Sequence, residues 1–140
     1  MTLDELIANF HGAASAFAQG DPEPVKRLFS KADDVTLANP FGPPVRGWAA
    51  VARALDYASS RFSKGYVSEI INIASYVTPK LATSLDAEKW HASVGGGDLT
   101  EFNLRVTTTF RPEAEGWLIV HRHADPISTA DERGPLRNAP

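Results

Sequence analysis

The spacing of hydrophobic residues predicts a helix close to the N-terminus. Apolar side chains recur every three or four residues, which places them on one helix face. They are Leu3, Leu6, Ile7, Phe10, Ala14 and Phe17. Thr2 and Glu5 form a T-x-x-E pattern, in which each side chain can bond to a free backbone amide of the first turn. Gly20 marks the end of this helix.

Two further helices are predicted downstream. Asp21-Pro22 is typical of a helix start, because a capping residue is followed by proline in the first turn. A longer helix is expected from Gly47 to about Lys64, and Gly65 is well placed to end it. One side of the longer helix carries the apolar residues Trp48, Val51, Leu55, Ala58 and Phe62.

After residue 65 the pattern changes to that of strands. β-Branched and aromatic residues become frequent, and residues 101–111 alternate between an apolar and a polar face. Pro79, Gly95–Gly97 and Gly116 mark turns between the segments. We expect long strands over residues 66–77, 81–93, 101–111 and 117–125, and a short strand over residues 35–37.

This order of elements predicts an α+β fold, with three N-terminal helices packed on one face of an antiparallel sheet. Long strands twist and curl. We therefore expect a strongly curved sheet that closes with the helices into a cone with an internal pocket. We also expect one domain over residues 1–127 and a loose C-terminal tail over residues 128–140, where apolar residues are few.

Composition narrows the classes of function. The 140 residues carry a net charge of −3 and no basic cluster, so neither nucleic acid nor a membrane surface is an expected partner. The absence of cysteine excludes disulfides, thiolate metal sites and thiol catalysis. No signal peptide is apparent, and no apolar run approaches the ~18–20 residues of a membrane span. We expect a cytoplasmic protein, and its motifs imply no cofactor.

The strongest candidate for chemistry is the sequence His121-Arg122-His123-Ala124-Asp125. On a regular strand His121, His123 and Asp125 share one face. Three interpretations remain open. The carboxylate can orient an imidazole that acts as a general base, the three groups can ligate a metal, or they can bond to one another and to nearby backbone as a structural feature. The metal interpretation lacks a further ligand at a recognisable spacing.

Asn39 is a second candidate, because it follows the short strand and precedes a proline. Its side chain either projects into a site at the strand end or bonds to its own backbone in an Asx-turn, which propensity favours. Arg105 and Arg111 lie on the polar face of a predicted strand, where a solvated or subunit-facing surface is the simpler interpretation.

Two stretches of sequence resemble the nuclear transport factor 2-like superfamily. The first contains Gly20-Asp21, Leu28-Phe29, residues 33–37, Asn39-Pro40, Gly42 and Arg46-Gly47. The second contains residues 104–107, Arg111 and residues 116–125, which include a W-x-x-V-H-x-H strand. The superfamily includes steroid Δ-isomerase, the SnoaL-like polyketide cyclases and the calcium/calmodulin-dependent kinase association domain. The second stretch looks like uncharacterised SnoaL-like proteins, and the kinase association domain carries a similar strand.

The resemblance implies a cone-shaped, cystatin-like fold, a pocket between sheet and helices, and a homodimer through the outer sheet face. It argues against steroid isomerase activity. The position of the isomerase's general-base aspartate is Asn39 here, and an amide cannot accept a proton at neutral pH. The places of its tyrosine and of its oxyanion-stabilising acid fall near Ala13 and Val106.

The same resemblance places the alternate residues His121, His123 and Asp125 inside the pocket. Our sequence-based hypothesis is therefore a SnoaL-like protein that binds a small apolar or amphipathic molecule. If it is an enzyme, we expect proton transfer, with His123 as base, Asp125 orienting it, His121 beside them and Asn39 polarising a carbonyl. The expected apolar wall contains Phe17, Leu37, Trp48, Leu55, Phe62, Leu104 and Val106. The alternative is a non-enzymatic association module.

Overall fold

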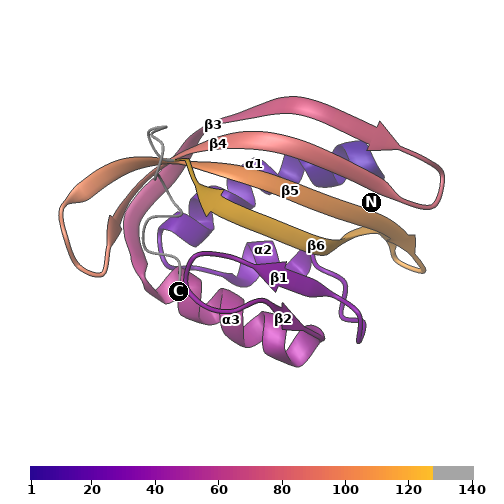
Figure 1. The fold of residues 1–140 in the computed structure, drawn as a ribbon, viewed down its shortest axis with the longest axis horizontal. Coiled ribbons are helices and arrows are strands. Elements are labelled where there is room, and N and C mark those ends of the chain that lie inside the picture. The colour runs from indigo at the N-terminus through magenta and orange to yellow at the C-terminus, as the bar shows by residue number, and fades with distance from the viewer. Residues whose placement is uncertain (128–140) are drawn as a thin grey trace, which may run out of the picture.

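The computed structural model describes residues 1–127 and shows three helices on one side of a curved six-stranded sheet (Figure 1). The expected tail over residues 128–140 lies outside the described residues. The elements are α1 (Leu3–Ala18), α2 (Glu23–Arg27), β1 (Thr36–Ala38), β2 (Val45–Arg46), α3 (Trp48–Ser60), β3 (Phe62–Val77), β4 (Ala82–Val94), β5 (Leu99–Glu113) and β6 (Gly116–Pro126). The predicted α+β class and the order of its elements are confirmed, with β2 as an additional short strand.

The first helix begins as the capping pattern predicts. The Glu5 backbone N–H donates to the Thr2 hydroxyl at 3.2 Å, and the Thr2 backbone N–H donates to the Glu5 carboxylate at 3.3 Å. Both bonds satisfy amides that a helix start leaves free.

The third helix ends earlier than predicted. α3 stops at Ser60, and Phe62 is already the first residue of β3. Gly65 therefore does not cap a helix. It lies within β3, where a Cβ atom would sit 2.6 Å from the Ala18 carbonyl oxygen at the end of α1. The glycine is required by this close approach of helix and strand, which local sequence does not reveal.

The sheet has the order β2-β1-β6-β5-β4-β3. β1 runs parallel to β6, whereas the other neighbouring strands are antiparallel. The concave face carries the helices, with α1 packed mainly on β3 and also touching β4 and β6 (Figure 1). This arrangement forms the core between helices and sheet, and no helix within residues 1–127 covers the convex face, where Ile71, Tyr76 and Leu85 are exposed.

A β-bulge in β6 decides which of its residues face inward. Thr109 of β5 pairs with His121, but the next residue, Phe110, pairs with Ile119. Val120 is therefore an extra residue without a partner across the strands. A bulge of this kind shifts the alternation of side chains by one position. Beyond Val120, the even-numbered residues of β6 take the inner face.

No helix within residues 1–127 has both the length and the apolar character that a membrane crossing requires.

Candidate functional site

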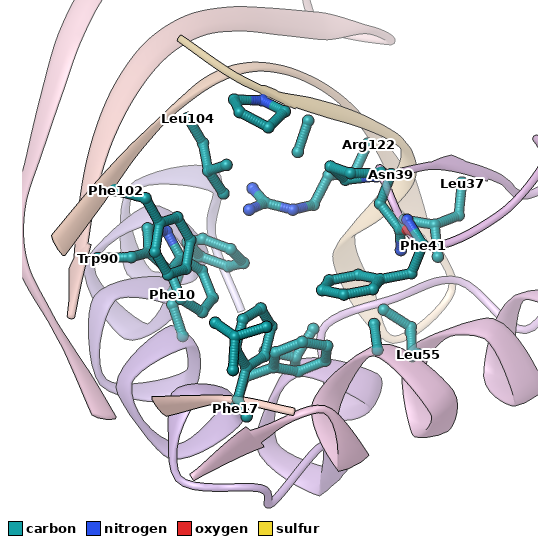
Figure 2. A pocket seen from close by; sticks show the side chains of 18 residues that line it. Phe10, Phe17, Leu37, Asn39, Phe41, Leu55, Trp90, Phe102, Leu104 and Arg122 are labelled. Atoms are coloured by element: carbon teal, nitrogen blue, oxygen red, sulfur yellow. The ribbon is translucent and has the colours of Figure 1, made fainter. Parts of the chain in front are cut away.

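A cavity of about 230 Å³ lies between α1, α3, the segment after β1 and the concave face of the sheet (Figure 2). Its walls are almost entirely apolar, as is usual for small-molecule sites. Aromatic rings come from every side of it. They are Phe10, Phe17, Phe41, Phe62, Trp90 and Phe102.

Strand pairing brings the rings of the sheet together. Trp90 of β4 lies directly opposite Phe102 of β5, so both side chains share the concave face. The Phe62 ring centroid lies 5.6 Å from that of Trp90 and 5.8 Å from that of Phe102, and Phe41 meets Phe62 edge-on at 5.4 Å. These distances are those of favourable aromatic pairs, which gives the cavity a rigid wall.

Two polar side chains reach this apolar cavity, namely Asn39 and Arg122. The Asn39 side-chain oxygen accepts the backbone N–H of Phe41 at 3.0 Å, which is the Asx-turn that propensity favoured. Its amide nitrogen makes no hydrogen bond within residues 1–127 and can donate to a ligand. Figure 2 shows the Arg122 guanidinium extending into the space between Phe102 and Phe41.

Arg122 forms a buried ion pair with Glu88 of β4. Its two terminal nitrogens donate to the two carboxylate oxygens at 3.0 and 2.8 Å, and the Trp90 indole N–H donates to the same carboxylate at 3.0 Å. The side chains are only 9% and 1% exposed. Burial alone raises the pKa of the Glu88 carboxyl, but the charge and hydrogen bonds of Arg122, with the Trp90 N–H, outweigh burial and lower that pKa below its usual value.

The remaining face of the guanidinium packs on an aromatic ring. The Arg122 guanidinium carbon lies 4.9 Å from the Phe10 ring centroid, a cation–π contact. Two charges of opposite sign are thus held together at the wall of an apolar cavity, and the pair is neutral as a unit.

Most of the predicted wall residues line the cavity, namely Phe17, Leu37, Asn39, Leu55, Phe62 and Leu104. Trp48 does not. It begins α3 and lies under the Lys31 ammonium, which is 4.2 Å from its ring centroid. Val106 does not line it either, because it is fully buried in the core further along β5.

The expectation that His121, His123 and Asp125 face the pocket is wrong. The bulge at Val120 turns all three to the convex face, and Arg122 and Ala124 take the inner positions. There His123 Nε2 lies 3.0 Å from an Asp125 carboxylate oxygen, and both side chains are about half exposed.

His121 bonds across to β1. Its Nδ1 lies 2.7 Å from the hydroxyl of Thr36. Burial, and secondly the neighbouring His123, lower the pKa of His121 below its usual value. In the part of the chain that the structure describes, no group of three or more His, Asp or Glu side chains is placed to hold a metal ion.

Sequence reasoning missed the ion pair and part of the aromatic wall. Glu88 and Trp90 fall within the strand predicted over residues 81–93, and both lie on one regular inner face of β4. The spacing of two residues between Glu88 and Trp90 is the sequence signal that could have placed both on one face of the strand. Arg122 carried no signal, because its inward direction depends on the bulge.

The chemical capacity of the cavity follows from its lining. Among residues 1–127, no Asp, Glu, His, Lys, Cys or Tyr side chain lines it. The lining offers hydrogen-bond donors, a guanidinium and an amide, rather than a group that takes up a proton near neutral pH. The fold and site define an α+β protein with a small, almost entirely apolar cavity between its helices and a curved sheet.

The chain belongs to the SnoaL-like domain family, whose sequence pattern it matches over residues 4–128. No match was found among curated proteins.

Solved structures share the fold. A proposed dehydratase of the nuclear transport factor 2-like family from Streptomyces avermitilis is 20% identical, with a TM-score of 0.72 over 91% of this chain and 95% of the other. A proposed calcium/calmodulin-dependent protein kinase type II association domain from Thiobacillus denitrificans is 20% identical, with a TM-score of 0.69 over 91% and 96%.

A ketosteroid isomerase-like protein from Erwinia carotovora is 18% identical, with a TM-score of 0.64 over 91% of this chain and 99% of the other. These identities establish the fold and carry no activity across. The predicted resemblance to the nuclear transport factor 2-like superfamily is confirmed.

Proposed function

We propose that this protein binds a small, neutral and mainly apolar molecule in the cavity between α1, α3 and the sheet. The proposal rests on the lining of the cavity. Six aromatic side chains enclose the cavity, and the one charged side chain in the lining, Arg122, is already neutralised by Glu88. Binding proceeds without acid–base chemistry by His123 and Asp125, because their side chains lie on the opposite face of the sheet.

The charge of the ligand follows from the ion pair. A second anion beside Arg122 would leave the cavity with an uncompensated buried negative charge, which is costly. A neutral ligand with one carbonyl or hydroxyl oxygen avoids this cost. That oxygen can accept hydrogen bonds from the Asn39 amide and from guanidinium N–H groups that Glu88 does not use.

Steroid isomerase activity is not part of this proposal. Ala13 and Val106, the places of the isomerase's tyrosine and acid, are buried apolar residues. Asn39 supplies a donor where that reaction needs a base.

Titration calorimetry with 2-naphthol and 2-naphthoate tests the proposal, since the two probes have similar shape and differ in charge. We expect 2-naphthol to bind and 2-naphthoate to bind at least tenfold more weakly. Leu104→Trp, which fills the cavity, abolishes binding. Leu99→Trp is the matched control, because Leu99 is an exposed residue of the same strand. Equal affinity for both probes, or full binding by Leu104→Trp, contradicts the proposal.

We further propose that the chain forms a homodimer through the convex face of the sheet. Tyr66, Ile71, Tyr76 and Leu85 are between 42% and 67% exposed, and Leu85 lies centrally among them. Bare apolar side chains on a broad sheet face are typical of an interface. Sedimentation should show a dimer that Leu85→Arg dissociates. Ile7→Arg on α1 is the control and leaves it intact. A monomeric wild type contradicts the dimer, and a larger ring favours the association module.

A further inference from the structure

A second, more polar groove of about 430 Å³ lies on the other side of Phe10. It is bounded by the N-terminal half of α1 and the concave face of β3, β4 and β5, with Ile119 of β6 at its edge. Phe10 lines both spaces. The ion pair lies between them, since Glu88 lines the groove and Arg122 lines the cavity described above. The groove is thus a separate space with its own chemistry.

Asp86 supplies an unbalanced negative charge to this groove. Its carboxylate accepts hydrogen bonds from the Asn72 amide at 2.8 Å and the Ser84 hydroxyl at 3.1 Å. These two bonds hold it in place. Within residues 1–127 it has no cationic partner, whereas Glu88 beside it is paired with Arg122. A carboxylate fixed by neutral donors retains its attraction for a cation.

Thr108 gives independent evidence for a ligand. It is only 5% exposed, lines the groove, and its hydroxyl has no hydrogen-bond partner in the described chain. No fully buried side-chain oxygen or nitrogen of residues 1–127 lacks a partner, so this hydroxyl must open into the groove. A hydroxyl on a buried residue that opens into a groove and has no protein partner is left for water or for a polar group of a ligand to satisfy.

His11 also lines the groove, and its Nε2 donates to the Val67 carbonyl oxygen at 2.6 Å. The rest of the lining is apolar, with Ile7, Ile70 and Phe110 beside the polar groups.

We propose that this groove binds a small organic ammonium ion that carries a short hydrocarbon chain. The ammonium group donates to the Asp86 carboxylate and the Thr108 hydroxyl, and the chain packs on Ile7, Ile70 and Phe110. Acceptors around one end and apolar surface at the other match such a cation, and they disfavour an anion.

NMR titration with n-hexylammonium tests this site, with n-hexanol as the neutral probe of equal length. We expect saturable shifts at the backbone amides of Ile7, His11, Asp86 and Thr108. The variant Asp86→Asn should bind about tenfold more weakly or worse, because it removes a charge-assisted hydrogen bond. Thr108→Val keeps the shape and should also weaken binding. The control is Asp98→Asn in the β4–β5 turn, which changes the net charge by the same amount. We expect it to bind n-hexylammonium like the wild type.

Three results would overturn the proposal. They are equal binding of n-hexanol, undiminished binding by Asp86→Asn, and shifts confined to the aromatic cavity. If Asp86→Asn does not fold, Thr108→Val decides between the outcomes by the same titration.

Discussion

The buried pair of Glu88 and Arg122 makes a quantitative prediction about stability. Arg122→Met keeps most of the volume of the side chain but leaves the Glu88 carboxylate buried without its partner. Breaking a buried pair in this way costs about 3–5 kcal/mol. We therefore expect the free energy of unfolding at neutral pH to fall by about that amount, measured by urea denaturation.

The pH dependence of that loss is a sharper test. In the wild type the pKa of Glu88 lies below its unfolded value of 4.5, so the pair contributes stability above that pH and loses it as the pH falls. In Arg122→Met burial is no longer opposed by a positive charge, and the pKa of Glu88 rises above its unfolded value. The variant's deficit should then shrink as the pH falls toward that raised pKa, because a protonated carboxyl is cheaper to bury.

A double variant measures the coupling between the two residues in a double-mutant cycle. Glu88→Leu with Arg122→Met replaces both charges by apolar groups, which is often neutral or stabilising. It should recover most of the stability that Arg122→Met loses, a coupling of about 2 kcal/mol or more. A single-variant loss below about 1 kcal/mol, a deficit independent of pH, or additive effects would refute the reasoning.

Three smaller predictions concern features described above. Gly65→Ala forces a Cβ against the Ala18 carbonyl oxygen and should cost about 1–3 kcal/mol in urea denaturation; an unchanged midpoint contradicts the close approach. Thr2→Ala removes the cap of α1 and should cost about 1 kcal/mol, with Glu5→Ala costing less; equal stability of wild type and variant would exclude the capping role. The pKa of His121, followed by NMR, should lie below 6.5 because burial disfavours its charged form, and a value at or above 6.5 contradicts this environment.

Local patterns were sufficient to predict most of the fold. The capping box, the helical spacing of α1 and the alternation of β5 each depend on neighbours within a few residues, so they are visible in the sequence. The end of α3 was not visible in this way. Phe62 continues the helical spacing of apolar residues, and only the pairing of β3 with β4 assigns it to a strand.

The candidate site was harder to predict, because it too depends on pairing between strands and not only on neighbouring residues. The cavity walls from Phe17, Leu55 and Leu104 follow from element faces and were expected. The direction of Arg122 was not, because charged residues are normally placed outside. Its inward position depends on the unpaired Val120, and this bulge arises from register with β5 rather than from any residue of β6 alone.

The bulge also makes the cavity's character depend on the register between β6 and β5. β6 contains two interleaved sets of side chains, imidazoles with a carboxylate in one and a guanidinium with small residues in the other. Deleting Val120 would make Ile119 and His121 direct neighbours, so the strand would alternate regularly and Arg122 would stay inside. A one-residue slip of the part of β6 beyond Val120 against β5 would instead exchange the two sets and bring His121 and His123 into the cavity. Sequence alignments of such chains therefore need the bulge placed correctly before any residue is compared.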